Sequence, residues 1–120
     1  MQNFIKNVIP SEMSTMRIEL DEFIELYNEG KCELVDVRVA MEIKVWQVNF
    51  GLKIPAPELP DRLDELPKDK LLVVACPKND RSNMARIWLA TQGYNVKYLS
   101  GGLLGLMDYL KGGKAKALKV

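Results

Sequence analysis

A cysteine placed between a buried strand and a helix is the first candidate for chemistry in this chain. The stretch CPKNDRS, residues 76–82, follows the apolar run LLVVA and leads into a helical pattern that begins near Ser82. Unpaired backbone N–H groups and the dipole at a helix start favour an anion, so a ring of main-chain donors here can stabilise a thiolate or a bound persulfide. Lys78 and Arg81 add positive charge. Cys76 is therefore either an accessible nucleophile or a small buried core residue.

Other residues of the loop bear on this choice in both directions. Pro77 has no N–H to donate, and Asp80 brings a carboxylate close to the proposed anion. Asp80 can instead cap the following helix or pair with Lys78 or Arg81, which would reduce the repulsion. Asn79 suits a turn because asparagine tolerates a positive φ better than most residues. From these residues alone, a reactive thiol and a structural thiol both remain open.

Composition removes several other kinds of site. The 120 residues include no histidine, which excludes Ser–His and Cys–His nucleophile pairs and the commonest metal ligand. Two cysteines, Cys32 and Cys76, are too few for a usual zinc site or a disulfide framework. We expect no metal and no other cofactor. We interpret Cys32 as a small buried residue rather than a resolving thiol, because it starts its strand, opposite the proposed active rim.

Size and charge predict one domain with no nucleic-acid or membrane partner. A chain of 120 residues fits a single core, and a net charge of +1 gives no field that attracts nucleic acid or an anionic membrane. No apolar run reaches the roughly 18 residues that a membrane span needs, and the first residues lack a signal-peptide pattern. We therefore expect a cytoplasmic protein, and the sequence leaves its oligomeric state open.

Strand and helix patterns alternate along the chain. The expected strands are 16–20, 32–37, 52–55, 70–76 and 95–99, and the expected helices are 21–30, 39–47, 58–65, 82–93 and 103–113. Such alternation is typical of an α/β domain with a mostly parallel sheet, where ligands bind beyond the carboxyl ends of the strands. Asp36, Arg38 and the Cys76 loop all follow such ends, so we expect them on one rim. We interpret Asp36 and Arg38 as a structural ion pair, and Met84 and Trp88 as core packing.

Taken in order, these stretches resemble the rhodanese-like domain family over roughly residues 16–111. LVDVR at 34–38 is similar to the family's LIDVR strand, and CPKNDRS is similar to its active loop, C-x-x-G-x-R-S/T. GYNVKYLSGGLLG at 93–105 is similar to the family's G-[YF]-x-x-V-x-x-L-x-G-G pattern. The resemblance implies a three-layer α/β fold with about five mostly parallel strands between helices. It leaves 1–15 as an N-terminal extension and 112–120 as a C-terminal tail.

The resemblance also implies sulfur transfer. Cys76 would take the sulfane sulfur of thiosulfate or a low-molecular-weight persulfide, hold it as a cysteine persulfide, and pass it to a thiol, a protein or another acceptor. Arg81 would brace the loop through an acidic group such as Asp36, and Arg38 would be a scaffold residue. The candidate site joins the nucleophile, its loop and two supporting residues: Cys76, Pro77, Lys78, Asn79, Asp80, Arg81, Ser82, Asp36 and Arg38.

Two other functions remain open on the same fold. A non-catalytic rhodanese-like module would keep the fold for protein contact or for sensing sulfur state. A phosphatase or arsenate reductase would have a loop one residue longer than the four residues between Cys76 and Arg81, so the loop length favours sulfur transfer. The chain departs from the family pattern at Asn79, where the loop usually has glycine, and at Leu106, which replaces a tryptophan. It departs also at WQVNFGLKIP, where the family often has GHIPGA-x-N-I-P.

Overall fold

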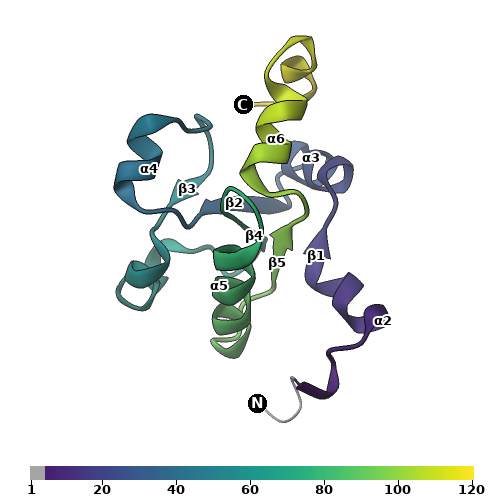
Figure 1. Ribbon diagram of the computed structural model, residues 1–120, viewed down its shortest axis with the longest axis vertical. Coiled ribbons are helices and arrows are strands. Elements are labelled where there is room, and N and C mark those ends of the chain that lie inside the picture. The colour runs from purple at the N-terminus through teal and green to yellow at the C-terminus, as the bar shows by residue number, and fades with distance from the viewer. Residues whose placement is uncertain (1–4) are drawn as a thin grey trace.

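Five parallel strands form one sheet at the centre of the computed structural model, which describes residues 5–120 (Figure 1). The strand order is β1-β5-β4-β2-β3, and the strands are β1 (Arg17–Ile18), β2 (Cys32–Asp36), β3 (Leu52–Lys53), β4 (Leu71–Ala75) and β5 (Val96–Leu99). The central strand β4 is a continuous apolar run because both of its faces are covered. The predicted parallel α/β fold is confirmed.

Helices cover both faces of the sheet and give three layers (Figure 1). Side chains of α3 (Leu20–Asn28) and α6 (Gly102–Leu110) pack with Val73 and Ala75 on one face. Side chains of α5 (Asp80–Thr91) and of the 3₁₀ segments η2 (Ala56–Asp61) and η3 (Leu63–Glu65) pack with Leu72 and Val74 on the other. The remaining elements are α2 (Pro10–Met13), η1 (Ser14–Met16), α4 (Ala40–Val45) and η4 (Gly113–Ala117).

All five expected helices differ from the structure at their boundaries, and three of the differences have a local cause or change the candidate loop. The helix expected over 58–65 is two 3₁₀ segments that part at Arg62, because Pro60 lies inside the first and has no N–H for an α-helical hydrogen bond. Helix α5 begins at Asp80, two residues before the expected start, so it includes part of the candidate loop. Helix α6 ends at Leu110, before the two glycines of the expected 103–113 helix.

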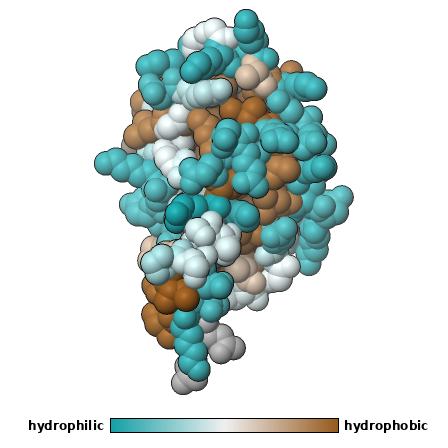
Figure 2. All heavy atoms as spheres, turned by 90° about the vertical axis from the view of Figure 1, so that its right-hand side faces the viewer, coloured by the Kyte–Doolittle hydropathy of each residue, from teal (hydrophilic) through white to brown (hydrophobic). Residues whose placement is uncertain are grey.

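The N-terminal segment projects from the body of the molecule, and apolar side chains gather on it (Figure 2). Its exposed large apolar residues include Ile5, Val8 and Ile9. The expected 1–15 extension is thus described from residue 5 onward, where it carries the short helix α2, and residues 1–4 lie outside the described part. Across residues 5–120, every helix is too short or too polar to cross a membrane.

Candidate active site

Parallel pairing brings the candidate residues of two distant segments to one edge of the sheet. Asp36, the last residue of β2, is in register with Ala75, the last residue of β4. Beyond these ends the Val37 N–H donates to the Ala75 carbonyl at 3.0 Å. Cys76 therefore follows β4 beside the segment that connects β2 to Arg38. This agrees with the expectation that Asp36, Arg38 and the Cys76 loop lie on one rim of the sheet. Cys32 pairs with Leu71 at the opposite end of the same strands.

The Cys76 sulfur lies against the first turn of α5. The Ser82 N–H donates to Sγ at 3.4 Å, and the Ser82 hydroxyl oxygen is also 3.4 Å from Sγ. That hydroxyl donates to the Asn79 carbonyl at 3.2 Å and can turn to donate to the sulfur once the thiol has lost its proton. These contacts place the sulfur at the positive end of the α5 helix dipole.

The Asp80 carboxylate occupies the same helix start. Its Oδ1 lies 3.5 Å from Sγ and accepts a hydrogen bond from the thiol. The backbone N–H of Arg81, followed by the Cys76 thiol, holds the pKa of Asp80 below its usual range. The carboxylate thus takes main-chain donors that sequence reasoning assigned to the sulfur. Within residues 5–120, Ser82 supplies the backbone N–H that donates to Sγ, so the expected ring of donors is smaller than predicted.

The structure describes two further features of the loop that the sequence left open or suggested differently. Of the two states left open for Cys76, the side chain adopts the buried one, with 0% exposure, since it packs with the core on the α5 side of the sheet. Asn79 does not adopt a positive φ, because its φ is −130°. An L-residue adopts that conformation without strain, which explains how this loop dispenses with the usual glycine.

The start of α6 fixes the carbonyl side of the loop. The Leu103 N–H donates to the Cys76 carbonyl at 2.8 Å, and the Leu104 N–H donates to the Pro77 carbonyl at 3.3 Å. Gly102 permits this approach, because a Cβ there would lie 2.5 Å from the Pro77 oxygen and 2.7 Å from the Cys76 oxygen. Its φ of +64° also favours glycine. The loop carbonyls therefore face α6.

Asp36 and Arg38 form a buried ion pair behind the loop. Arg38 Nη2 donates to Asp36 Oδ2 at 2.8 Å, and Arg38 Nε lies 3.1 Å from both carboxylate oxygens. Both side chains are nearly inaccessible, and the guanidinium also stacks over the Trp46 ring, 4.2 Å from its centroid. The arginine's charge is thus used within the scaffold. This is the structural ion pair that the sequence predicted.

Arg81 does not pair with Asp36, as the resemblance had implied, but with Glu42 of α4. Its Nη1 and Nη2 donate to the two Glu42 carboxylate oxygens at 2.5 and 2.9 Å. Glu42 also accepts the Val39 N–H at 3.2 Å, which anchors it at the start of α4. The hydrogen bond from Arg81 lowers the pKa of Glu42 to about 2. Asp36 is not available to Arg81 because Arg38 occupies both of its oxygens.

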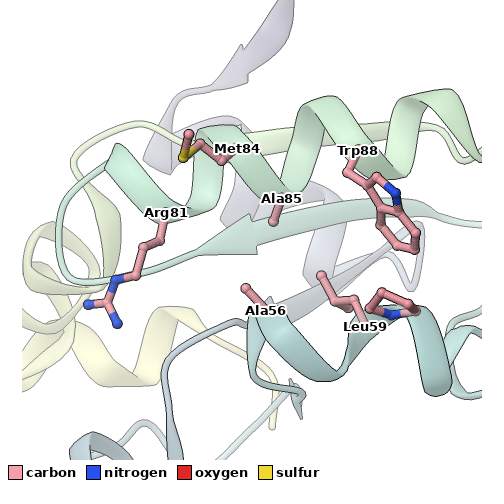
Figure 3. Close-up of a pocket in the computed structure, with 7 residues that line it drawn as sticks. Ala56, Leu59, Arg81, Met84, Ala85 and Trp88 are labelled. Atoms are coloured by element: carbon pink, nitrogen blue, oxygen red, sulfur yellow. The ribbon is translucent and has the colours of Figure 1, made fainter.

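An apolar groove runs along α5 beside the loop (Figure 3). This α5 groove has a cavity volume of about 290 Å³ and is lined by Ala56, Leu59, Pro60, Arg81, Met84, Ala85 and Trp88. Arg81 lies at one end and Trp88 at the other (Figure 3). Met84 is 73% exposed and Trp88 is only partly buried, so the expectation that both are core packing is wrong for Met84 and incomplete for Trp88.

Cys32 lies in the core, far from this rim. Burial, with a smaller contribution from Glu33, raises its pKa to about 11, so it is a poor nucleophile near neutral pH. Its interpretation as a small buried residue agrees with an exposed fraction of 3%. Across residues 5–120, no group of histidine, cysteine and carboxylate side chains is arranged to hold a metal ion.

Sequence reasoning missed the roles of Glu42 and Gly102. Glu42 stands three residues after Val39, the spacing at which a glutamate returns to the start of its helix, but nothing local indicates an arginine 39 residues away as its partner. Gly101 and Gly102 belong to the stretch 93–105 that carries the family resemblance, which assigns them no contact with the loop. Two consecutive glycines before an apolar helix are a signal for close backbone approach, and here the approached backbone is the candidate loop.

Comparisons with known proteins agree with this geometry. The family model described as "Rhodanese-like domain" matches residues 19–108. A protein of Allochromatium vinosum named "Sulfurtransferase" is 38% identical over 72 residues, which are 59% of this chain and 67% of that protein. A solved rhodanese-related protein from Thermoplasma volcanium is 26% identical, with a TM-score of 0.68, over 77% of this chain and 90% of that one. Bacillus anthracis CoADR-RHD is 32% identical with a TM-score of 0.70, over 79% of this chain but only 17% of that longer one.

Proposed function

Because this chain belongs to the rhodanese-like domain family, we propose that it is a sulfurtransferase in which Cys76 carries the transferred sulfur. The donor is thiosulfate or a low-molecular-weight persulfide, and the acceptor is a thiol, a protein or another nucleophile. The observation that supports this role is the position of the Cys76 sulfur. It lies at the carboxyl end of the central strand and receives the Ser82 N–H from the first turn of α5.

The reaction has two balanced steps. The Cys76 thiolate attacks the outer sulfur of the donor, a bond forms between Sγ and that sulfur, and the donor's S–S bond breaks with its electron pair. With thiosulfate the leaving group is sulfite, and with a hydropersulfide R–S–SH it is the thiolate RS⁻. An acceptor thiolate next attacks the outer sulfur of the Cys76 persulfide, and Sγ leaves as a thiolate. The helix start that favours an anion at Sγ assists both steps.

The surrounding residues have supporting roles in this scheme. The start of α6 holds the loop carbonyls, and the Arg81–Glu42 pair ties the loop to α4, so the sulfur is presented on a braced backbone. The α5 groove, which begins at Arg81, offers apolar contact for the organic part of a donor or acceptor. We assign Asp36 and Arg38 no part in bond making, because they are paired with each other inside the scaffold.

The two alternatives make different use of the same residues. A non-catalytic module is favoured by the complete burial of Cys76, and it predicts that no sulfur is ever loaded. A phosphatase or arsenate reductase needs an oxyanion at the start of α5, where the Asp80 carboxylate now lies. That carboxylate and the short loop make the second alternative the weaker one.

Intact-mass measurement after incubation with a sulfur donor tests the proposal. We expect an adduct of one sulfur atom with thiosulfate or with a low-molecular-weight hydropersulfide. Cys76→Ser should abolish the adduct, whereas Cys32→Ser, the matched control at the opposite end of the sheet, should retain it. A folded protein that accepts no sulfur from any donor would favour the module. Turnover of an aryl phosphate or of arsenate would instead support the second alternative.

A further inference from the structure

We propose that Asp80 is a specificity-determining residue, which disfavours anionic donors such as thiosulfate and selects an organic hydropersulfide that reacts in its protonated form. This inference deepens the proposed function and rests on it. The observation behind it is that a carboxylate, rather than a cation, lies 3.5 Å from the sulfur.

The position of Asp80 makes its charge unavoidable for a donor. Its Oδ1 is 3.5 Å from Sγ, which is about the distance at which the outer sulfur of a donor must approach. The side chain is exposed, whereas Cys76 beneath it is fully buried. A donor must therefore displace the carboxylate from Sγ or bind against it. In either case the donor comes within a few ångströms of a negative charge at the start of α5.

Nearby positive charge does not fully offset this carboxylate. The Arg81 guanidinium is already paired with both oxygens of Glu42, so that pair contributes little net charge to the mouth of the site. Lys78 is exposed on the loop, and one lysine can at most balance one carboxylate. A dianion such as thiosulfate therefore meets a mouth with little or no net positive charge, which is a poor site for a small doubly charged ligand.

Hydrogen bonding favours the protonated hydropersulfide for the same reason. An ionised carboxylate only accepts hydrogen bonds, and thiosulfate likewise presents only acceptors, so the two groups repel. The S–H of R–S–SH can donate to Asp80 as the Cys76 thiol now does. After Cys76 attacks the outer sulfur, that proton stays on the new persulfide and RS⁻ leaves. The organic group R has an apolar surface within reach in the α5 groove, which inorganic thiosulfate cannot use.

The test compares Asp80→Asn with Asp69→Asn, using kcat/KM for thiosulfate and for an alkyl hydropersulfide released from a caged precursor. Asp69 is an exposed aspartate near the amino end of β4, so its variant removes the same charge at the opposite end of the strand. We expect Asp80→Asn to raise kcat/KM for thiosulfate by about tenfold, the scale of one repulsive charge contact after solvent screening. The value for the hydropersulfide should stay the same or fall, and Asp69→Asn should change neither.

Salt dependence separates a charge effect from a structural one. The difference in kcat/KM for thiosulfate between wild type and Asp80→Asn should become smaller as ionic strength rises from about 0.01 to 1 M. The Debye length falls over that range from about 30 to 3 Å, so the charge of Asp80 is screened. Asp80→Ser, which keeps a side-chain oxygen at the first residue of α5 but carries no charge, should behave like Asp80→Asn. In a Cys76→Ser background, calorimetry should show tighter thiosulfate binding when Asp80 is also replaced by asparagine.

Three results would overturn the inference. Equal changes with both donors in Asp80→Asn would show that the carboxylate only supports the loop. A wild type that prefers thiosulfate, with no gain in Asp80→Asn, would show that its charge does not matter. If no variant forms an adduct with either donor, the proposed function itself fails, and the inference fails with it. This last result differs from the first two, in which sulfur is still loaded on Cys76.

Discussion

One methyl group added at Gly102 tests whether the start of α6 fixes the loop that carries Cys76. A Cβ there would lie 2.5 Å from the Pro77 carbonyl oxygen, 2.7 Å from the Cys76 carbonyl oxygen, and closer still to that of Lys78. These atoms belong to the backbone and cannot swing aside as a flexible side chain could. The loop or the helix must therefore shift when alanine replaces glycine.

The expected loss of stability follows from three costs. A φ of +64° costs a non-glycine residue about 1–2 kcal/mol, and overpacking adds about 1–3 kcal/mol. The shift also weakens two hydrogen bonds from Leu103 and Leu104 to the loop, each worth about 1 kcal/mol. We expect Gly102→Ala to lower the free energy of unfolding by about 3 kcal/mol or more, and the Tm by roughly 10 °C. Sulfur loading on Cys76 should fall as its carbonyl is displaced.

Two neighbouring glycines provide matched controls in urea and thermal unfolding followed by circular dichroism. Gly101 has a φ of +80° but its Cβ would meet only Gly105 Cα at 3.8 Å, so Gly101→Ala carries the conformational cost without the clash. Gly105 is helical with open space at its Cβ, so Gly105→Ala should stabilise by about 0.5–1 kcal/mol. The reasoning is refuted if Gly102→Ala is as stable as Gly101→Ala and still loads sulfur.

Three further predictions concern the scaffold. Asp36→Asn leaves the Arg38 guanidinium buried without its counter-charge, so urea unfolding should show a loss of about 3–5 kcal/mol, and a loss below about 1 kcal/mol would contradict a buried pair. Glu42→Gln removes a partly exposed pair with Arg81 and should cost at most about 1 kcal/mol at neutral pH. The pKa of Glu42 is lowered from 4.5 to about 2, so the pair's contribution to the free energy of unfolding is present above about pH 4.5 and disappears as the pH falls toward 2. The unfolding curves of variant and wild type should therefore converge near pH 2. Iodoacetamide at pH 8 should leave Cys32 unmodified in the native protein, because burial raises the pKa of this thiol to about 11. Peptide mass measures the modification, and rapid alkylation of Cys32 would show that this end of the sheet opens.

The sheet could be predicted from the sequence because each strand has a local pattern. The run LLVVA is apolar without interruption, which a strand covered on both faces requires, and the alternation with helices fixes the parallel arrangement. Residues 56–65 could not be predicted as two 3₁₀ segments, because leucines at helical spacing occur there together with Pro60. Hydrophobic spacing does not distinguish an α-helix from tighter turns when a proline removes one of the hydrogen bonds.

The sequence could predict where the candidate site lies, but not which carboxylate pairs with Arg81. Asp36 and Arg38 are two residues apart after a strand, so their ion pair follows from local geometry. The pairing of Arg81 with Glu42 depends on the path of the chain between β2 and β3, where α4 has only six residues and little periodicity. The burial of Cys76 depends on how the core packs around it beneath α5, which the order of residues in the loop does not fix.

The first turn of α5 attracts negative charge, and the chain places two groups there that can carry it. Ser82 donates its N–H to the Cys76 sulfur, while the N–H of Arg81 holds the carboxylate of Asp80. The attraction of a helix start falls off within one turn, so a thiolate and a carboxylate at this distance compete for it. A doubly charged donor would add to that competition, whereas a protonated hydropersulfide adds a hydrogen-bond donor and no charge. The Arg81–Glu42 pair acts in the same direction, since it removes a cation that an anionic donor would otherwise meet. This distribution of charge is the basis of the proposed preference for an organic persulfide over thiosulfate.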